Sequence, residues 1–256
     1  MTITILGCIG IFLIVSLILL PAKQAKAETL IESTLFFRIY VAFNVDQKAA
    51  QAWLPAPWKA VSLPKGPFKG TNLFIVFNDK LIGQDAEGKP DRGGIYCYTV
   101  LVAFGKNPQT KEFIPFVIRG YWSHDDPGAY KNAVKATVSR EATIKGATPK
   151  SGSGSEIWKV QDSAGGILEL RMDYQRAVPK LAKREFKVRS SVEPDFFRIY
   201  REDYAVSLVK SIPAGINRMK YYRFRSTIPE LRKMFNGSEQ LVGISVNPCV
   251  RQVFLP

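Results

Sequence analysis

Residues 35–57 read LFFRIYVAFNVDQKAAQAWLPAP, and this stretch contains a strand, a short helix and a proline-rich turn in that order. The run from Leu35 to Val45 is aromatic and β-branched, which favours a strand. Asp46 then stands where a helix N-cap is expected, and the helix DQKAAQAWL should stop before Pro55. The stretch therefore predicts a strand–helix–turn entry into the fold.

The rest of the chain continues with short strand-like segments and few helices. Strands are expected at residues 72–78, 94–104, 113–122, 156–161, 166–174, 184–190, 196–201, 204–209, 219–225, 241–246 and 250–255. Short helices are expected at about 128–136 and at 229–235. Because no βαβ alternation is visible, we expect an α+β fold that is mostly antiparallel β, a barrel or sandwich with a few short helices. The pentapeptide FFRIY occurs at 36–40 and again at 196–200, and its unmatched flanks indicate recurring strand chemistry rather than a duplicated domain.

The first 27 residues have the layout of a secretory signal peptide. An apolar run from Ile3 to Leu20 is followed by Pro21 and by Ala25-Lys26-Ala27, an A-x-A cleavage pattern before Glu28. The alternative is an uncleaved membrane anchor, which would be the chain's only membrane contact. We expect a signal peptide at 1–27, a single domain at 28–256, and a periplasmic or secreted protein.

The chain is strongly basic. Its formal net charge is +14, and removal of Lys23 and Lys26 with the signal peptide would leave +12. Such a charge suggests an anionic neighbour, such as membrane lipid, a cell-wall polymer or an acidic small molecule. Nucleic acid is not expected as a partner, because the chain is predicted to leave the cytoplasm and its basic residues are scattered.

The residues needed for several kinds of catalysis are absent from the sequence. His124 is the only histidine, and no C-x-x-C pair is present, so we expect no metal site. There is no G-x-S-x-G elbow, no G-x-G-x-x-G and no Walker loop, and no cofactor is expected. Whether Cys97 and Cys249 form a disulfide is left open by the sequence. What remains is lysine chemistry.

The order of segments resembles the acetoacetate decarboxylase family over most of residues 28–256. The first strand, the short helix and Leu54-Pro55-Ala56-Pro57 are similar to the strand–helix–LPxP segment with which the family's fold begins. Cys97-Tyr98-Thr99 lies in a strand like the one that carries an active-site glutamate in the family. Phe116–Asp126 resembles the strand before the catalytic segment. Arg140-Glu141, followed by Pro149-Lys150, resembles its R-E-x(n)-P-K-K signature. The resemblance implies an acetoacetate decarboxylase-like barrel in which Lys150 forms a Schiff base with a keto acid, while Arg140 and Glu141 organise the loop. As an alternative, Glu141 would serve as proton donor or acceptor.

The sequence departs from the family pattern at several positions. The gap before Pro149-Lys150 is longer, so Lys145 competes with Lys150 for the role of the family lysine. Val100 stands where the family has a glutamate, and Phe36 aligns with its early active-site arginine.

Two functions follow from these observations. The preferred one is an exported lyase that acts on a small keto acid through a lysine Schiff base, with the substrate and a possible homo-oligomer left open. The alternative is a non-catalytic β-barrel protein that binds a small anionic or apolar ligand. Further cavity-lining residues are expected among polar residues of the strands, namely Tyr98, Arg119, Tyr121 and Arg171.

Overall fold

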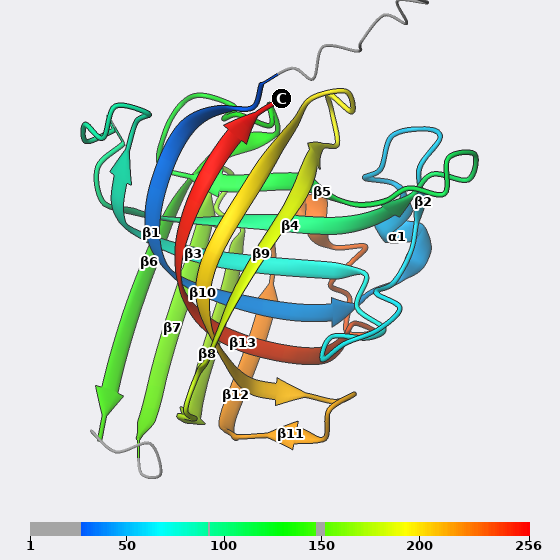
Figure 1. Ribbon diagram of the computed structural model, residues 1–256. Coiled ribbons are helices and arrows are strands. Elements are labelled where there is room, and N and C mark those ends of the chain that lie inside the picture. Colours follow the sequence, from blue (N-terminus) through cyan, green and yellow to red (C-terminus); the bar gives the residue numbers. More distant parts are fainter. Residues whose placement is uncertain (1–26, 92, 147–151) are drawn as a thin grey trace, which may run out of the picture.

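The computed structural model describes residues 27–91, 93–146 and 152–256 (Figure 1). Its elements in chain order are β1 (Thr29–Asn44), α1 (Gln47–Gln51), β2 (Lys59–Ala60), β3 (Leu73–Gln84), β4 (Tyr96–Lys106), β5 (Phe113–Trp122), β6 (Ala133–Lys145), β7 (Ser153–Asp162), β8 (Ile167–Gln175), β9 (Lys180–Ser190), β10 (Phe197–Ser211), β11 (Ile216–Asn217), β12 (Met219–Ser226), the 3₁₀ helix η1 (Pro229–Leu231) and β13 (Gln240–Leu255). The mostly antiparallel β architecture with short helices is confirmed.

Seven strands form a closed barrel. In sheet order these strands are β5, β9, β10, β13, β1, β3 and β4, and β5 closes the ring because it pairs with β9 on one side and with β4 on the other. In Figure 1, β1, β13, β10 and β9 run side by side as one wall, and β3 and β4 cross behind them. The first and last strands, β1 and β13, are neighbours in this wall, where Thr29 pairs with Leu255.

The alternation of side chains along β1 divides the residues between two interiors. Ile39, Val41 and Phe43 belong to the main hydrophobic core, whereas Arg38 and Tyr40 line a cavity inside the barrel. This strand has both faces covered, which explains why its sequence is a nearly continuous apolar run rather than a simple apolar–polar alternation.

A second sheet covers the outer face of the barrel. It consists of β12, β8, β7 and β6, and a short parallel pairing of β5 with β6 joins it to the barrel. The main core lies between the two layers: Phe77 of β3 packs on Trp158 of β7 with ring centroids 5.3 Å apart, and Leu170 and Met172 of β8 are buried in the same cluster. This is the larger of the two hydrophobic clusters in the described residues, so much of the hydrophobic stabilisation arises from it.

Some of these elements agree with the local sequence predictions, and others differ. The Asp46 cap is confirmed, since its carboxylate accepts the backbone N–H of Ala49 at 2.8 Å. The helix expected at 128–136 is wrong: residues 128–132 form a turn, because Gly128 and Lys131 take positive φ, and Ala133 begins β6. The segments expected as separate strands at 196–209 and at 241–255 are each one long strand, β10 and β13.

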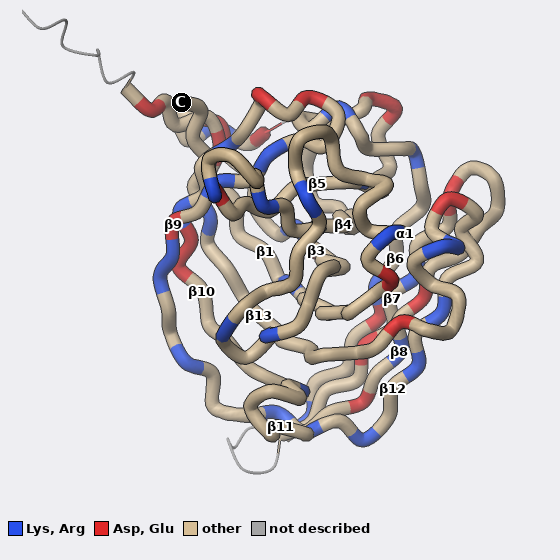
Figure 2. Tube along the Cα trace, turned by 90° about the vertical axis from the view of Figure 1, so that its right-hand side faces the viewer, with Lys and Arg blue, Asp and Glu red and all other residues tan. Residues whose placement is uncertain are grey.

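Residues 1–26, where the signal peptide is predicted, lie outside the described residues. Within residues 27–91, 93–146 and 152–256, no helix is long and apolar enough to cross a membrane. Lys and Arg positions are spread along the strands of both layers (Figure 2). The basic residues, which are scattered along the sequence, are therefore also distributed over the whole structure and do not form one patch in this view.

Candidate functional site

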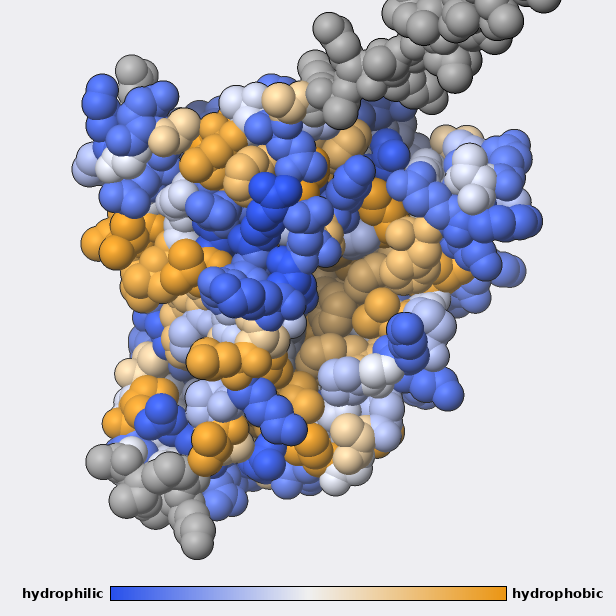
Figure 3. All heavy atoms as spheres, in the orientation of Figure 1, coloured by the Kyte–Doolittle hydropathy of each residue, from blue (hydrophilic) through white to orange (hydrophobic). Residues whose placement is uncertain are grey.

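The barrel encloses a cavity of about 260 Å³. Side chains from all seven barrel strands line it, together with the loop from Pro127 to Tyr130 that connects β5 to β6. The space-filling view shows a hollow right of centre whose visible walls are largely apolar (Figure 3). A concave apolar space with a few polar groups is the usual form of a small-molecule site.

Arginine is the dominant charged residue of the cavity. In the part of the chain that the structure describes, its wall contains Arg38 of β1, Arg184 of β9, Arg198 of β10 and Arg251 of β13, and the only acids there are Glu32 and Glu202. The lining therefore carries an excess of two positive charges. Among the described residues, no lysine lines this cavity.

One ion-pair network is centred on Glu202 of β10. Its carboxylate accepts Arg38 Nη1 at 2.7 Å on one oxygen and Arg184 Nη2 at 2.6 Å on the other, and both guanidinium groups also donate to the Tyr40 hydroxyl. Burial by itself would raise the pKa of Glu202, but Arg38 and Arg184 lower it to about 2. Arg38 Nε donates to Asn78 at 2.8 Å, which leaves its Nη2 atom buried without a partner.

A second, looser cluster lies at Glu32. Its carboxylate is 3.6 Å from Arg198 and 3.8 Å from Arg251, too far for hydrogen bonds. The guanidinium of Arg251 lies over the rings of Phe36 and Tyr200, 4.6 Å and 4.7 Å from their centroids. The Nε atoms of both arginines are buried without a partner. The cluster thus presents guanidinium donors held in place by rings, with free hydrogen-bonding capacity.

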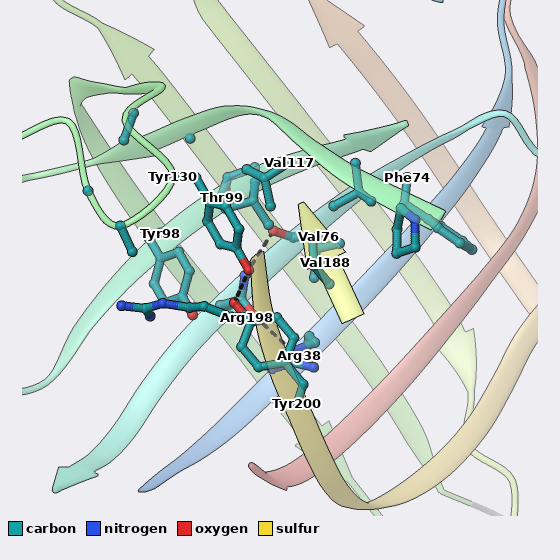
Figure 4. Close-up of a pocket in the computed structure, with 18 of the residues that line it drawn as sticks. Arg38, Phe74, Val76, Tyr98, Thr99, Val117, Tyr130, Val188, Arg198 and Tyr200 are labelled. Atoms are coloured by element: carbon teal, nitrogen blue, oxygen red, sulfur yellow. Dashed lines mark hydrogen bonds between the residues drawn. The ribbon is translucent and has the colours of Figure 1, made fainter. Parts of the chain in front are cut away.

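Tyrosines complete the polar part of the wall. The hydroxyls of Tyr130 and Tyr200 are 2.6 Å apart, and Figure 4 shows Tyr200, Tyr98 and Arg198 near one another in the cavity. Burial raises the pKa of Tyr98 and of Tyr130 above the usual value, so both hydroxyls stay protonated at neutral pH. They are therefore hydrogen-bond donors for a ligand oxygen.

Two of the residues expected at the site border the cavity. Tyr98 faces it directly from β4, and Tyr121 of β5 borders it while donating its hydroxyl to Glu230 at 2.7 Å. Arg119 does not line it: its guanidinium pairs with Glu230 at 2.5 Å and lies over the Trp53 ring, beside a shallow surface groove.

The other expected residues lie away from the barrel interior. Arg140 of β6 is between the two layers, where it binds Glu156 in a bidentate pair at 2.9 Å and Asp79 at 2.7 Å. Glu141, the next residue on β6, points the opposite way and is exposed. Arg171 of β8 pairs with Glu169 on the second sheet.

The two lysines considered for the Schiff base differ in what the structure says of them. Lys150 lies outside the described residues, and Lys145 is the exposed last residue of β6 and does not line the cavity. Residues 139–145 are strand and not loop, because they pair in antiparallel register with residues 153–159 of β7.

The cavity arginines were not among the residues selected from the sequence. The signal that could have identified two of them is the repeated FFRIY: its arginine and tyrosine are Arg38 and Tyr40 on β1, and Arg198 and Tyr200 on β10, and all four line the cavity. Position 36, which aligned with the family arginine, is a buried phenylalanine against Arg38, with 5.0 Å between Arg38 Cζ and the ring centroid.

Other chemistry expected from the sequence can also be placed. Cys97 and Cys249 are free thiols. Val100, at the position of the family glutamate, lines the cavity with an apolar side chain. Within the described ranges, no cluster of three or more His, Cys, Asp or Glu residues could hold a metal ion.

No family model matches the chain, and no curated protein matches it in sequence. Solved structures do match. The enduracididine biosynthesis enzyme MppR aligns with TM-score 0.55 and 10% identity over 89% of this chain and 88% of its own, in a complex with the condensation product of pyruvate and imidazole 4-carboxaldehyde. Its complex with pyruvate aligns with TM-score 0.54 and 7% identity over 91% of each chain.

A third structure, an acetoacetate decarboxylase-like enzyme from Sphingomonas wittichii RW1, aligns with TM-score 0.51 and 10% identity over 87% of this chain and 90% of its own. At such identities the likeness concerns the fold. The acetoacetate decarboxylase-like fold expected from the order of segments is therefore confirmed.

Proposed function

We propose that this chain, which has the acetoacetate decarboxylase-like fold, binds a small organic carboxylate in its barrel cavity. The observation that carries the proposal is the set of buried guanidinium atoms without partners in the lining: Arg38 Nη2, Arg198 Nε and Arg251 Nε. A buried charged donor without an acceptor is costly, and a carboxylate would supply acceptors for charge-assisted hydrogen bonds. A wall with an excess of positive charge favours the same ligand.

A keto acid is the class we propose first. One of the similar structures is a complex with pyruvate, and another holds a condensation product of pyruvate. The protonated hydroxyls of Tyr98 and Tyr130 would donate to the keto oxygen, while arginine holds the carboxylate. Export of the protein, predicted from residues 1–27, stays part of the proposal, since that segment falls almost wholly outside the described residues.

Calorimetric titration tests this function. Pyruvate and acetoacetate are expected to bind, whereas methyl pyruvate, which lacks the charge, is expected to bind at least tenfold more weakly. Arg251→Gln and Arg198→Gln should each weaken pyruvate binding, and two variants are used in case one fails to fold. Arg201→Gln is the matched control, because Arg201 pairs with Glu28 and Glu185 and does not line the cavity. Equal affinity for pyruvate and its methyl ester would overturn the proposal.

A lyase is the second candidate, and Lys80 is the observation that favours it. This buried lysine lies on β3 in the same alternation as Phe74, Val76 and Asn78, which line the cavity, and its ammonium is 5.0 Å from the centroid of the Tyr96 ring. Its ammonium forms an ion pair with Asp91, and the amine would have to leave this pair before it could attack a carbonyl carbon.

Trapping separates the two candidates. In a Schiff-base lyase the amine nitrogen attacks the keto carbon, water leaves, and borohydride then reduces the imine to a stable secondary amine. Incubation with pyruvate or acetoacetate and borohydride, followed by peptide mapping, would place an adduct on Lys80 or on Lys150. Binding without an adduct on either residue supports the non-catalytic binder. Lys80→Met and Lys150→Ala are the variants that assign an adduct.

A further inference from the structure

The cavity has two chemically different walls, and this division follows the sheet order. Neighbouring strands β9, β10, β13 and β1 supply the charged side chains described above, while β3, β4 and β5 stand on the other side of the ring. The lining residues of that side are largely apolar. They include Phe74, Val76, Val102, Phe104 and Val117, with Val188 of β9 beside them.

The apolar wall is continuous in space. Phe74 packs on Phe104 with ring centroids 5.6 Å apart, and Val76 and Val102 follow on the two neighbouring strands. Figure 4 shows Phe74, Val76, Val117 and Val188 together on one side of the cavity, apart from Arg198 and Tyr98. A ligand oxygen placed here would find no hydrogen-bonding side chain in this group, so the wall favours hydrocarbon.

The volume of the cavity limits the size of the apolar group that a bound carboxylate can carry. A dry cavity of about 150 Å³ in another protein holds benzene, and this one has about 260 Å³. A three-carbon keto acid alone would fill only part of it. Room remains for a phenyl ring or an alkyl chain of about six carbons beyond the carboxylate.

We infer that the preferred ligand is an amphiphilic monocarboxylate, with its carboxylate on the arginines and a phenyl- or hexyl-sized apolar group on the wall formed by β3, β4 and β5. This inference rests on the proposed carboxylate-binding function and names its ligand class. Each methylene that moves from water to this wall should tighten binding about fourfold until the cavity is full.

The experiment is a titration with a homologous series of straight-chain carboxylates from acetate to decanoate, with phenylpyruvate against pyruvate as a second pair. Affinity should rise stepwise up to about eight carbons and then level off, and phenylpyruvate should bind at least tenfold more tightly than pyruvate. Adipate, the dicarboxylate of hexanoate's length, should bind more weakly than hexanoate, because its second charge would face the apolar wall.

Variants of the apolar wall give a second measurement. Val102→Thr keeps the side-chain volume and adds a hydroxyl, so it should weaken octanoate binding at least threefold more than it weakens acetate binding. Val178→Thr is the control, since Val178 is exposed and does not line the cavity. Val102→Phe should exclude octanoate while still admitting acetate.

The outcomes distinguish this inference from the function on which it rests. If affinity is flat along the series, or if adipate binds more tightly than hexanoate, the amphiphilic ligand is refuted while carboxylate binding stands. If no carboxylate binds, both are refuted. A stepwise rise that Val102→Thr reduces supports both.

Discussion

The guanidinium of Arg38 on β1 and the carboxylate of Glu202 on β10 form a 2.7 Å ion pair inside the barrel, although 164 residues separate them in the chain. In the sheet, β13 lies between β10 and β1. The ion pair therefore reaches across the strand that comes last in the sequence. Arg184 binds the other carboxylate oxygen. Two arginines thus share one buried acid, and this arrangement leaves positive charge available to a ligand.

Loss of the Glu202 charge should strongly destabilise the protein. Glu202→Gln leaves the buried Arg38 and the partly exposed Arg184 without their counter-charge, and breaking a buried pair such as Arg38–Glu202 costs about 3–5 kcal/mol of unfolding free energy. Urea unfolding of the wild type and of Glu202→Gln measures this loss of unfolding free energy. Asp203→Asn is the matched control on the adjacent residue, whose exposed carboxylate pairs with Lys183 at 3.1 Å. Its effect should stay below about 1 kcal/mol; equal losses for both variants would contradict the network.

The same carboxylate should make the protein acid-sensitive. Its folded pKa of about 2 is below the unfolded value of about 4.3. A lowered folded pKa contributes stability that is fully present above the unfolded value and is lost as pH falls from about 4.3 toward 2. The difference in melting temperature between the wild type and Glu202→Gln should therefore shrink through that window. A difference that stays constant from pH 7 to pH 2 would refute this.

The two thiols should react slowly in the folded protein. Burial raises the pKa of Cys97 to about 12, and burial also raises that of Cys249. Little thiolate is then present at pH 8, and the thiolate is the reactive form. Iodoacetamide should modify both residues much faster in urea than in buffer, as measured by peptide mass spectrometry. A disulfide-linked peptide containing both residues would contradict the free thiols of the structure.

A single added methyl group should disturb the second sheet. A Cβ at Gly154 on β7 would overlap the ring of Tyr174 on β8, a side chain that is buried in the main core. Overpacking of this kind costs about 1–3 kcal/mol. Gly154→Ala should lower the urea midpoint accordingly, while Ser155→Ala, on the other face of the same strand, should leave it within about 0.5 kcal/mol of the wild type.

The helix cap gives a smaller and more local effect. Asp46→Ala removes the acceptor of the Ala49 N–H at the start of α1, and loss of an N-cap typically costs about 1 kcal/mol. Asp46→Asn retains an acceptor oxygen and should recover most of that loss. Thermal melting of both variants checks this, and an Asn variant as unstable as the Ala variant would argue against capping.

The sequence by itself determined the local elements and part of the chemistry. Aromatic and β-branched runs predicted most of the strands, because side-chain shape acts on the nearest backbone. Asp46 predicted the start of a helix for the same local reason, whereas the helix ends at Gln51, before the limit expected at Pro55. The single histidine and the absence of nucleotide motifs restricted the possible chemistry, because these restrictions depend only on which residue types the chain contains.

Only the tertiary structure decided which polar residues meet. Period-two alternation says that Arg38 and Ile39 face opposite ways, but both faces of β1 are buried, so it cannot say which face meets the cavity. That choice depends on long-range pairing, such as β1 with β13 and β5 with β9. For the same reason Arg140, selected for its neighbours in sequence, pairs with Glu156 and Asp79 between the layers. The two copies of FFRIY contain two of the cavity arginines, Arg38 and Arg198. Only closure of the barrel brings these two residues to the same cavity.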